Sequence, residues 1–250
     1  MEAKLIRLDE VDSTNRWMRD YVPPAEEPMT ICTADFQTAG QGCGANSWES
    51  ERGKNLLFSL LIHPENIAAR AQFQISMAAS LAISDAMADF GIEGIRVKWP
   101  NDIYWRDWKL CGILIENRLS GTTIRDSIVG IGVNVNQTEF RFPKAIGHDP
   151  KTDPSPVSMR QILGREIERE TVLRSIVGHL KLCSCMADYT RMRYNALLYR
   201  RNQGAFPFRD KNGEFQAEIL EVDELGRLLL KKADGQAAAY AFKEVRFIRE

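Results

Sequence analysis

Up to residue 135 the chain holds several short runs dominated by apolar or β-branched residues and bounded by glycine, proline or polar clusters. Runs of this length and composition are typical of strands inside a sheet. Residues 56–63 form an uninterrupted apolar run and are predicted to be a buried strand. The predicted strands are residues 3–8, 30–36, 56–63, 95–99, 103–105, 110–117 and 127–135.

Helical patterns separate some of these strands. Asp12-Ser13-Thr14-Asn15 supplies N-cap residues for a first helix, which Pro23-Pro24 ends. Residues 67–90 are predicted to form a long amphipathic helix with Gly91 just beyond its C-terminus. The apolar positions that set its spacing are Phe73, Met77, Leu81 and Met87.

The composition changes near Arg201. Ahead of this point, residues 141–157 hold four prolines and are predicted to be a loop, and residues 165–199 to be mostly helical. Residues 214–249 show short strands separated by turn signals, which predict a small barrel-like β module. We therefore predict two domains, residues 1–200 and 201–250. Because helices lie between some strands and hairpins between others, the first domain is α+β rather than doubly wound.

Composition and charge narrow the class of protein. Of the 250 residues, 44% are hydrophobic and 27% charged, which is ordinary for a globular protein that buries a sizeable core. The net charge of -1 gives no reason to expect a nucleic-acid or membrane partner. No apolar run is long enough for a membrane span, and the N-terminus lacks signal-peptide features. Five scattered cysteines match neither a disulfide framework nor a zinc site, so we expect a reduced, cytoplasmic protein.

The segment Gly40-Gln41-Gly42-Cys43-Gly44 follows a predicted strand. A dinucleotide fingerprint would need glycine in place of Ala45 and then a helix, and a Walker loop would need Gly-Lys-Ser/Thr. Neither is present. Two interpretations stay open: a loop whose backbone amides close over an anion, or a mobile connection without a ligand.

A second polar cluster follows the strand at residues 95–99. Lys98, Asn101, Asp102 and Lys109 lie within twelve residues. Chemistry on a carboxylate and a triphosphate needs cations near the developing charge, and usually Mg²⁺ held by one or two carboxylates plus phosphate oxygens. From these residues alone, however, a strand that ends at a surface turn is the favoured interpretation.

Four motifs follow one another over roughly residues 8–136. They are Asp12-Ser13-Thr14-Asn15; Gln37-Thr38-Ala39-Gly40-Gln41-Gly42 with Trp48; Lys98-Trp99-Pro100-Asn101-Asp102 with residues 109–116; and Gly130-Ile131-Gly132-Val133-Asn134-Val135-Asn136. In this order they resemble the motifs of biotin–protein ligases, and the terminal β module resembles the SH3-like domain of that family. The resemblance implies a class II synthetase-like mixed sheet with flanking helices, followed by a small SH3-like β-barrel.

The resemblance also implies roles for the matching residues. Neutral donors and acceptors would bind the neutral ureido ring of biotin. Lys109 would hold the biotin carboxylate and the α-phosphate, with Lys98 and Asp102 as further catalytic residues. Asp102 is also a candidate Mg²⁺ ligand, or a group that orients the acceptor lysine. The implied biotin-binding residues are Ser13, Thr14, Asn15, Gln37 and Gly112. The implied adenylate-binding residues are Gly40, Gln41, Gly42, Cys43, Trp48, Asn101, Lys109 and Asn134.

The implied activity has two steps. The biotin carboxylate attacks the α-phosphate of ATP to give biotinyl-5′-AMP and pyrophosphate, with Mg²⁺ as cofactor. A lysine amine on the biotin carboxyl carrier domain of a carboxylase then displaces AMP. The chain would act as a monomer or homodimer. The alternatives are a lipoate–protein ligase or octanoyl transferase of the same fold, and a non-catalytic module that binds biotin or a carrier protein.

Two features depart from the family pattern. Many members carry Gly-Arg-Gly-Arg in the glycine loop, whereas Gln41 and Cys43 stand at the arginine positions here. Arg52 and Lys54 lie just beyond and are candidate substitutes. Our hypothesis is that Lys98, Lys109 and backbone amides retain the adenylate, less tightly than in arginine-bearing relatives. Because the Ser-Thr-Asn element begins at Ser13, we also expect no N-terminal winged-helix domain and no repressor role through one.

Overall fold

The computed structural model describes residues 3–24, 27–44, 46–140, 155–183 and 187–248. Within these residues, eight strands form one mixed sheet, in which β1 pairs with β2 and β6 with β8 in parallel while the other pairings are antiparallel. The path runs β1-β2-β3-β7-β6-β5-β4, and β8 pairs with β6. The strands are β1 (Lys4–Val11), β2 (Met29–Gln37), β3 (Leu56–Ile62), β4 (Ile95–Lys98), β5 (Asp102–Trp105), β6 (Trp108–Ser120), β7 (Thr123–Val133) and β8 (Ser155–Pro156).

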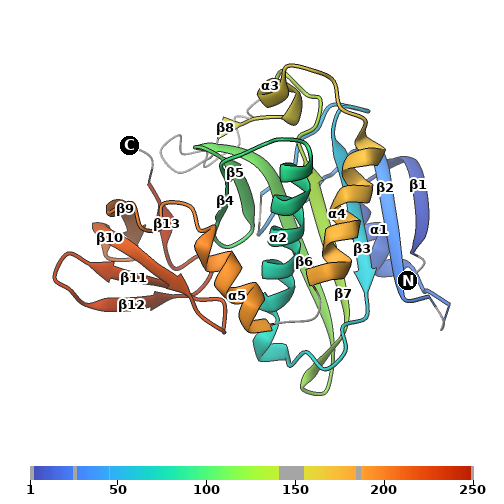
Figure 1. The fold of residues 1–250 in the computed structure, drawn as a ribbon. Helices are drawn as coiled ribbons and strands as arrows, with labels where there is room; N and C mark the ends of the chain where they lie inside the picture. The colour runs from blue at the N-terminus through green and yellow to red at the C-terminus, as the bar shows by residue number, and fades with distance from the viewer. Residues whose placement is uncertain (1–2, 25–26, 45, 141–154, 184–186, 249–250) are drawn as a thin grey trace.

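Helices cover both faces of this sheet, as predicted for an α+β fold. Figure 1 shows α2 (Phe73–Asp89) and α4 (Arg169–Cys183) side by side over one face, with α5 (Ala187–Ala196) beside α2. Helix α1 (Thr14–Asp20) packs on β2, β3 and β7. Strand alternation divides the apolar side chains between the two faces: Leu60 faces the main core, whereas Leu61 packs with Met18 of α1.

Helix α2 begins later than predicted, at Phe73 instead of residue 67. The backbone of the preceding residues pairs with the tip of the β6–β7 hairpin: Ala69 N donates to Thr122 O, and Ile124 N to Ile67 O, both at 2.9 Å. These groups are therefore unavailable for helical bonds. The helix is also less amphipathic than predicted, because eleven of its seventeen residues are buried between the sheet, α4 and α5.

The predicted loop at residues 141–157 lies mostly outside the described residues. Its last part is not a loop, because Ser155–Pro156 forms β8 alongside Trp108 and Lys109 of β6. Val157 N donates to Lys109 O at 2.9 Å and extends this pairing. The short helix α3 (Met159–Leu163), which the sequence analysis did not predict, follows with Ser158 and Gln161 in a reciprocal capping box.

The C-terminal strands form a second sheet, antiparallel throughout, in the order β12-β11-β10-β9-β13. It begins at Ala205, earlier than predicted, and has β12 and β13 at its edges. Gly226 and Gly235 adopt φ of +79° and +83° in two of the predicted turns, which favours glycine there. The strands are β9 (Ala205–Asp210), β10 (Gly213–Val222), β11 (Leu228–Lys232), β12 (Ala237–Tyr240) and β13 (Arg246–Phe247).

The second sheet packs against the first part of the chain, at the end opposite β1 in Figure 1. Trp99 Nε1 donates to Gly226 O at 2.9 Å, and the side-chain amide of Asn195 bonds both backbone groups of Val222. Apolar side chains from both sheets form one continuous core. Within the described residues, no helix combines the length and apolar character needed to cross a membrane.

Candidate functional site

A pocket opens where the start of α1 and strands β6 and β7 meet the glycine loop, residues 40–48. It brings together residues from Ser13 to Gly132 that lie far apart in sequence. Most of the predicted site residues line it: Ser13, Thr14, Asn15, Gln37, Gln41, Gly42, Cys43, Trp48, Asn101, Lys109 and Gly112. Its other lining residues are Ile113, Leu114, Gly130, Ile131 and Gly132.

One side of the pocket is a cluster of neutral hydrogen-bonding groups at the start of α1. Gln37 Oε1, at the end of β2, accepts from Thr14 N at 2.7 Å and from Thr14 Oγ1 at 3.1 Å. Ser59 Oγ lies 2.8 Å from Thr14 Oγ1 and 2.6 Å from Asn15 Oδ1. Sequence analysis missed Ser59, although a single hydroxyl inside the apolar run of β3 is a signal of a buried polar partner.

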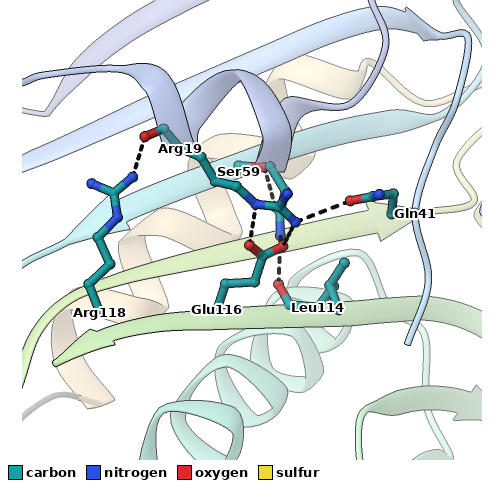
Figure 2. Close-up of polar contacts among 7 residues, drawn as sticks. Arg19, Gln41, Ser59, Leu114, Glu116 and Arg118 are labelled. Atoms are coloured by element: carbon teal, nitrogen blue, oxygen red, sulfur yellow. Dashed lines mark hydrogen bonds and ion pairs between the residues drawn. The ribbon is translucent and has the colours of Figure 1, made fainter. Parts of the chain in front are cut away.

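The amide of Asn15 is held on both sides. Its Nδ2 donates to Leu114 O at 3.2 Å and to Glu116 Oε1 at 3.1 Å. Figure 2 shows that Arg19, in the last turn of α1, donates to the same carboxylate through two nitrogens. Its Nη2 also lies 3.4 Å from Gln41 Oε1. Burial pushes the pKa of Glu116 upward, but the hydrogen bonds from Arg19 and Asn15 outweigh it, and the net pKa is lowered.

Two glycines of β7 make room for these groups. A Cβ at Gly130 would lie 2.1 Å from Asn15 Oδ1, and one at Gly132 would lie 2.5 Å from Trp48 Cε2. Both positions therefore require glycine for as long as Asn15 and Trp48 stay in place. Gly130 and Gly132 of the glycine–asparagine motif thus line the pocket.

The charged side of the pocket contains Lys109, whose Nζ lies 2.7 Å from Asp102 Oδ1. A shift in the β5–β6 register between Ile103 and Tyr104 marks a bulge, which is a common way to redirect a side chain. Lys109 Nζ also lies 5.6 Å from the centre of the Trp48 ring. Asn101 Nδ2 donates to Ile113 O at 2.6 Å and lies 3.0 Å from Cys43 Sγ, so it joins the glycine loop to β6.

Four of the predicted residues do not line the pocket: Gly40, Lys98, Asp102 and Asn134. Lys98 Nζ lies 5.5 Å and 5.0 Å from the ring centres of Tyr104 and Phe247, so it packs toward the C-terminal sheet. Asn134 is buried and donates to Lys109 O and Val157 O, which fixes the backbone that carries Lys109. Asp102 contacts the pocket through Lys109.

The glycine loop is closed by its own backbone. Trp48 N donates to Gly40 O at 2.9 Å, and Gly42 N to Asn46 O at 2.8 Å. A Cβ at Gly40 would lie 2.4 Å from Trp48 O, so the close approach requires glycine. Burial raises the pKa of the Cys43 thiol, an effect that Asp102 increases and that Lys109 and Lys243 oppose.

The two cations suggested by the sequence as substitutes for loop arginines do not line the pocket. Arg52 stacks over Phe36, donates to Asp9 O and pairs with Glu10 at the edge of the sheet. Lys243 of the C-terminal segment instead approaches the loop, since a Cβ at Gly44 would lie 2.8 Å from its Nζ. Within the described residues, no group of three or more acidic, histidine or cysteine side chains is arranged to hold a metal ion.

Comparisons with known proteins agree with this geometry. Residues 8–134 match the model of the biotin/lipoate A/B protein ligase family. The chain is 30% identical over 250 residues to the bifunctional ligase/repressor BirA of Bacillus spizizenii, covering 96% of this chain and 73% of that protein. It is 29% identical over 236 residues to the biotin–[acetyl-CoA-carboxylase] ligase of Paracoccus denitrificans, covering 92% and 95%.

A solved structure extends the likeness to three dimensions. The biotin protein ligase from Aquifex aeolicus, in complex with biotin and ATP, superposes with a TM-score of 0.78 at 25% identity. The superposition covers 99% of each chain and therefore includes the C-terminal strands.

Proposed function

This chain belongs to the biotin/lipoate A/B protein ligase family, and on that premise we propose that it is an ATP-dependent biotin–protein ligase. It activates biotin as biotinyl-5′-AMP and transfers it to a lysine of a biotin carboxyl carrier domain. The observation that carries the proposal is a single pocket with a neutral polar cluster on one side and Lys109 on the other. This division matches a ligand with a neutral ring and an anionic tail.

The neutral side suits the ureido ring of biotin. Thr14, Asn15 and Gln37 offer hydroxyl and amide groups, which bind a neutral polar ring without the cost of burying an unpaired charge. Lipoate and octanoate carry no ureido group for these side chains to bond, and a site built to hydrogen-bond a polar group rejects analogues that lack it. The cluster therefore favours biotin over the acids used by other members of the family.

The charged side suits the activation step. Lys109 holds the biotin carboxylate beside the α-phosphate and offsets the charge that develops as one attacks the other. The loop amides and Trp48 cover this end and limit the access of water to the reactive acyl-adenylate. The presence of Lys109 in the pocket also argues against a module that binds biotin without activating it.

Asp102 would contribute one carboxylate to a Mg²⁺ ion, since it lies beside the cation of Lys109, which lines the pocket, although Asp102 itself does not. One carboxylate fits the usual mode of binding, in which phosphate oxygens and waters supply the remaining ligands. When bound, the ion would neutralise phosphate charge during adenylate formation. We also propose that residues 1–200 form the catalytic domain and that residues 201–250 form an SH3-like domain.

The proposal is tested by biotin-dependent exchange of labelled pyrophosphate into ATP, run in parallel with lipoate and octanoate. A biotin ligase gives exchange with biotin alone. Exchange with lipoate and none with biotin would favour the alternative within the same fold. Tight biotin binding without any exchange would favour the non-catalytic module.

A further inference from the structure

Arg19 contacts Gln41, which lines the pocket, and Glu116, which bonds the pocket residue Asn15. It stands in the last turn of α1, where a cation is favoured by the helix dipole. Its Nη2 donates to Glu116 Oε1 at 2.8 Å, its Nε donates to the other carboxylate oxygen, and its Nη2 also lies 3.4 Å from Gln41 Oε1. The guanidinium thus joins α1, β6 and the glycine loop (Figure 2).

The contact with Glu116 is one of three hydrogen bonds that set the orientation of Asn15. The two Nδ2 hydrogens of Asn15 are directed to Leu114 O and Glu116 Oε1, and its Oδ1 accepts from Ser59. If the Asn15 amide were flipped, its Oδ1 would face two acceptor oxygens, and its Nδ2 could not accept the hydrogen bond from Ser59. Glu116 is the charged one of these three partners, and Arg19 holds its carboxylate with two bonds.

The contact with Gln41 concerns the loop. Gln41 is neutral, and its amide oxygen can accept a hydrogen bond from the Arg19 guanidinium. An arginine at position 41 would instead face Arg19 with like charge. The cation at this contact comes from α1.

We propose that Arg19 is a positioning residue for biotin, which fixes the Asn15 amide through Glu116 and the glycine loop through Gln41. The proposal rests on the function given above. The Arg19 and Glu116 side chains are 42% and 27% exposed, and ion pairs this exposed contribute little to stability. The ion pair therefore acts by positioning Asn15 and the glycine loop, and its loss should lower the affinity for biotin.

The test compares Arg19→Gln, Arg19→Lys and wild type by calorimetric binding of biotin without ATP, by KM in pyrophosphate exchange, and by thermal unfolding. We expect Arg19→Gln to weaken biotin binding about tenfold, as for the loss of one charge-assisted contact, with a much smaller change in KM for ATP. Arg19→Lys keeps the positive charge but cannot form the two parallel hydrogen bonds of the guanidinium. It should fold like wild type and bind biotin with intermediate affinity.

Arg118→Gln is the matched control. Arg118 also stands on β6 and donates to α1, at Arg19 O, but among the described residues its side chain hydrogen-bonds to neither Glu116 nor Gln41 (Figure 2). This variant should bind biotin like wild type.

A charge reversal separates positioning from a merely structural role. Arg19→Glu with Glu116→Arg restores an ion pair between α1 and β6 but places a donor opposite Asn15 Nδ2, where an acceptor is needed. Because this exposed pair contributes little to stability, we expect the unfolding temperature to stay near that of wild type while biotin affinity is low.

Wild-type biotin affinity in the reversed pair or in Arg19→Gln would overturn the proposal. If wild type neither binds biotin nor catalyses exchange, the proposed function is itself wrong and the role of Arg19 falls with it. If wild type is active and Arg19→Gln binds biotin equally well, only the role of Arg19 is wrong and the proposed function stands.

Discussion

Lys109 Nζ lies 2.7 Å from Asp102 Oδ1, across the hairpin of β5 and β6. We expect Asp102→Asn to slow adenylate formation about tenfold to a hundredfold, because Lys109 loses its counter-ion and Mg²⁺ loses a carboxylate. A titration of pyrophosphate exchange with Mg²⁺ should show a higher midpoint in the variant. A lower rate with an unchanged Mg²⁺ midpoint would contradict the assignment of Asp102 to the metal.

The glycines of β7 give a prediction about stability. A Cβ at Gly130 would overlap Asn15 Oδ1, so Gly130→Ala should lower the free energy of unfolding by about 1–3 kcal/mol and weaken biotin binding. Gly178, inside α4, has open space around a built Cβ, and Gly178→Ala should add up to about 1 kcal/mol. Urea unfolding measures both. Equal effects at the two positions would refute the close contact at Gly130.

The arginine-free loop predicts weaker retention of the adenylate than in arginine-bearing relatives. Lys98 does not line the pocket, so retention depends on Lys109 and the loop amides. Gln41→Arg with Cys43→Arg should slow adenylate release about tenfold or more, and Cys43→Arg alone should give most of the effect, since position 41 faces Arg19. Ser47→Arg controls for added charge. Release at the wild-type rate from the double variant would disprove the hypothesis.

The Cys43 thiol gives a prediction about pH. Because burial raises its pKa, less thiolate is present at any given pH than for an ordinary cysteine, and alkylation by iodoacetamide should accelerate only at higher pH. Lys243→Gln removes one opposing cation and should slow alkylation of Cys43 further. Lys231→Gln, on an exposed position of β11, should not. Peptide mapping identifies the modified cysteine, and rapid labelling of Cys43 at neutral pH would contradict the buried site.

The strands and the C-terminal turns were predictable because their signals are local. The buried run of β3 and the turn glycines Gly226 and Gly235 act through neighbouring residues. The start of α2 was not predictable, because the residues before Phe73 pair with a hairpin tip some fifty residues further along the chain. The four ordered motifs identified most of the pocket lining, since each contributes residues at the ends of neighbouring elements.

The remaining site contacts depend on tertiary packing. Lys98 is adjacent to a pocket motif in sequence, yet its side chain lies against Tyr104 and Phe247. Arg19 and Glu116 are 97 residues apart and carry no motif that links them. Their pairing arises because α1 packs on β2, β3 and β7, and β6 is the strand next to β7. The local sequence around either residue does not encode this arrangement.

The central claim is that the pocket activates biotin and that Lys109 is needed for this. The most direct measurement is the transfer of labelled biotin to the lysine of a biotin carboxyl carrier domain with ATP and Mg²⁺, for wild type and Lys109→Ala. We predict ATP-dependent labelling by wild type and a loss of about a hundredfold or more in the variant. No transfer by wild type would contradict the proposed function, and full activity in Lys109→Ala would contradict the role of Lys109.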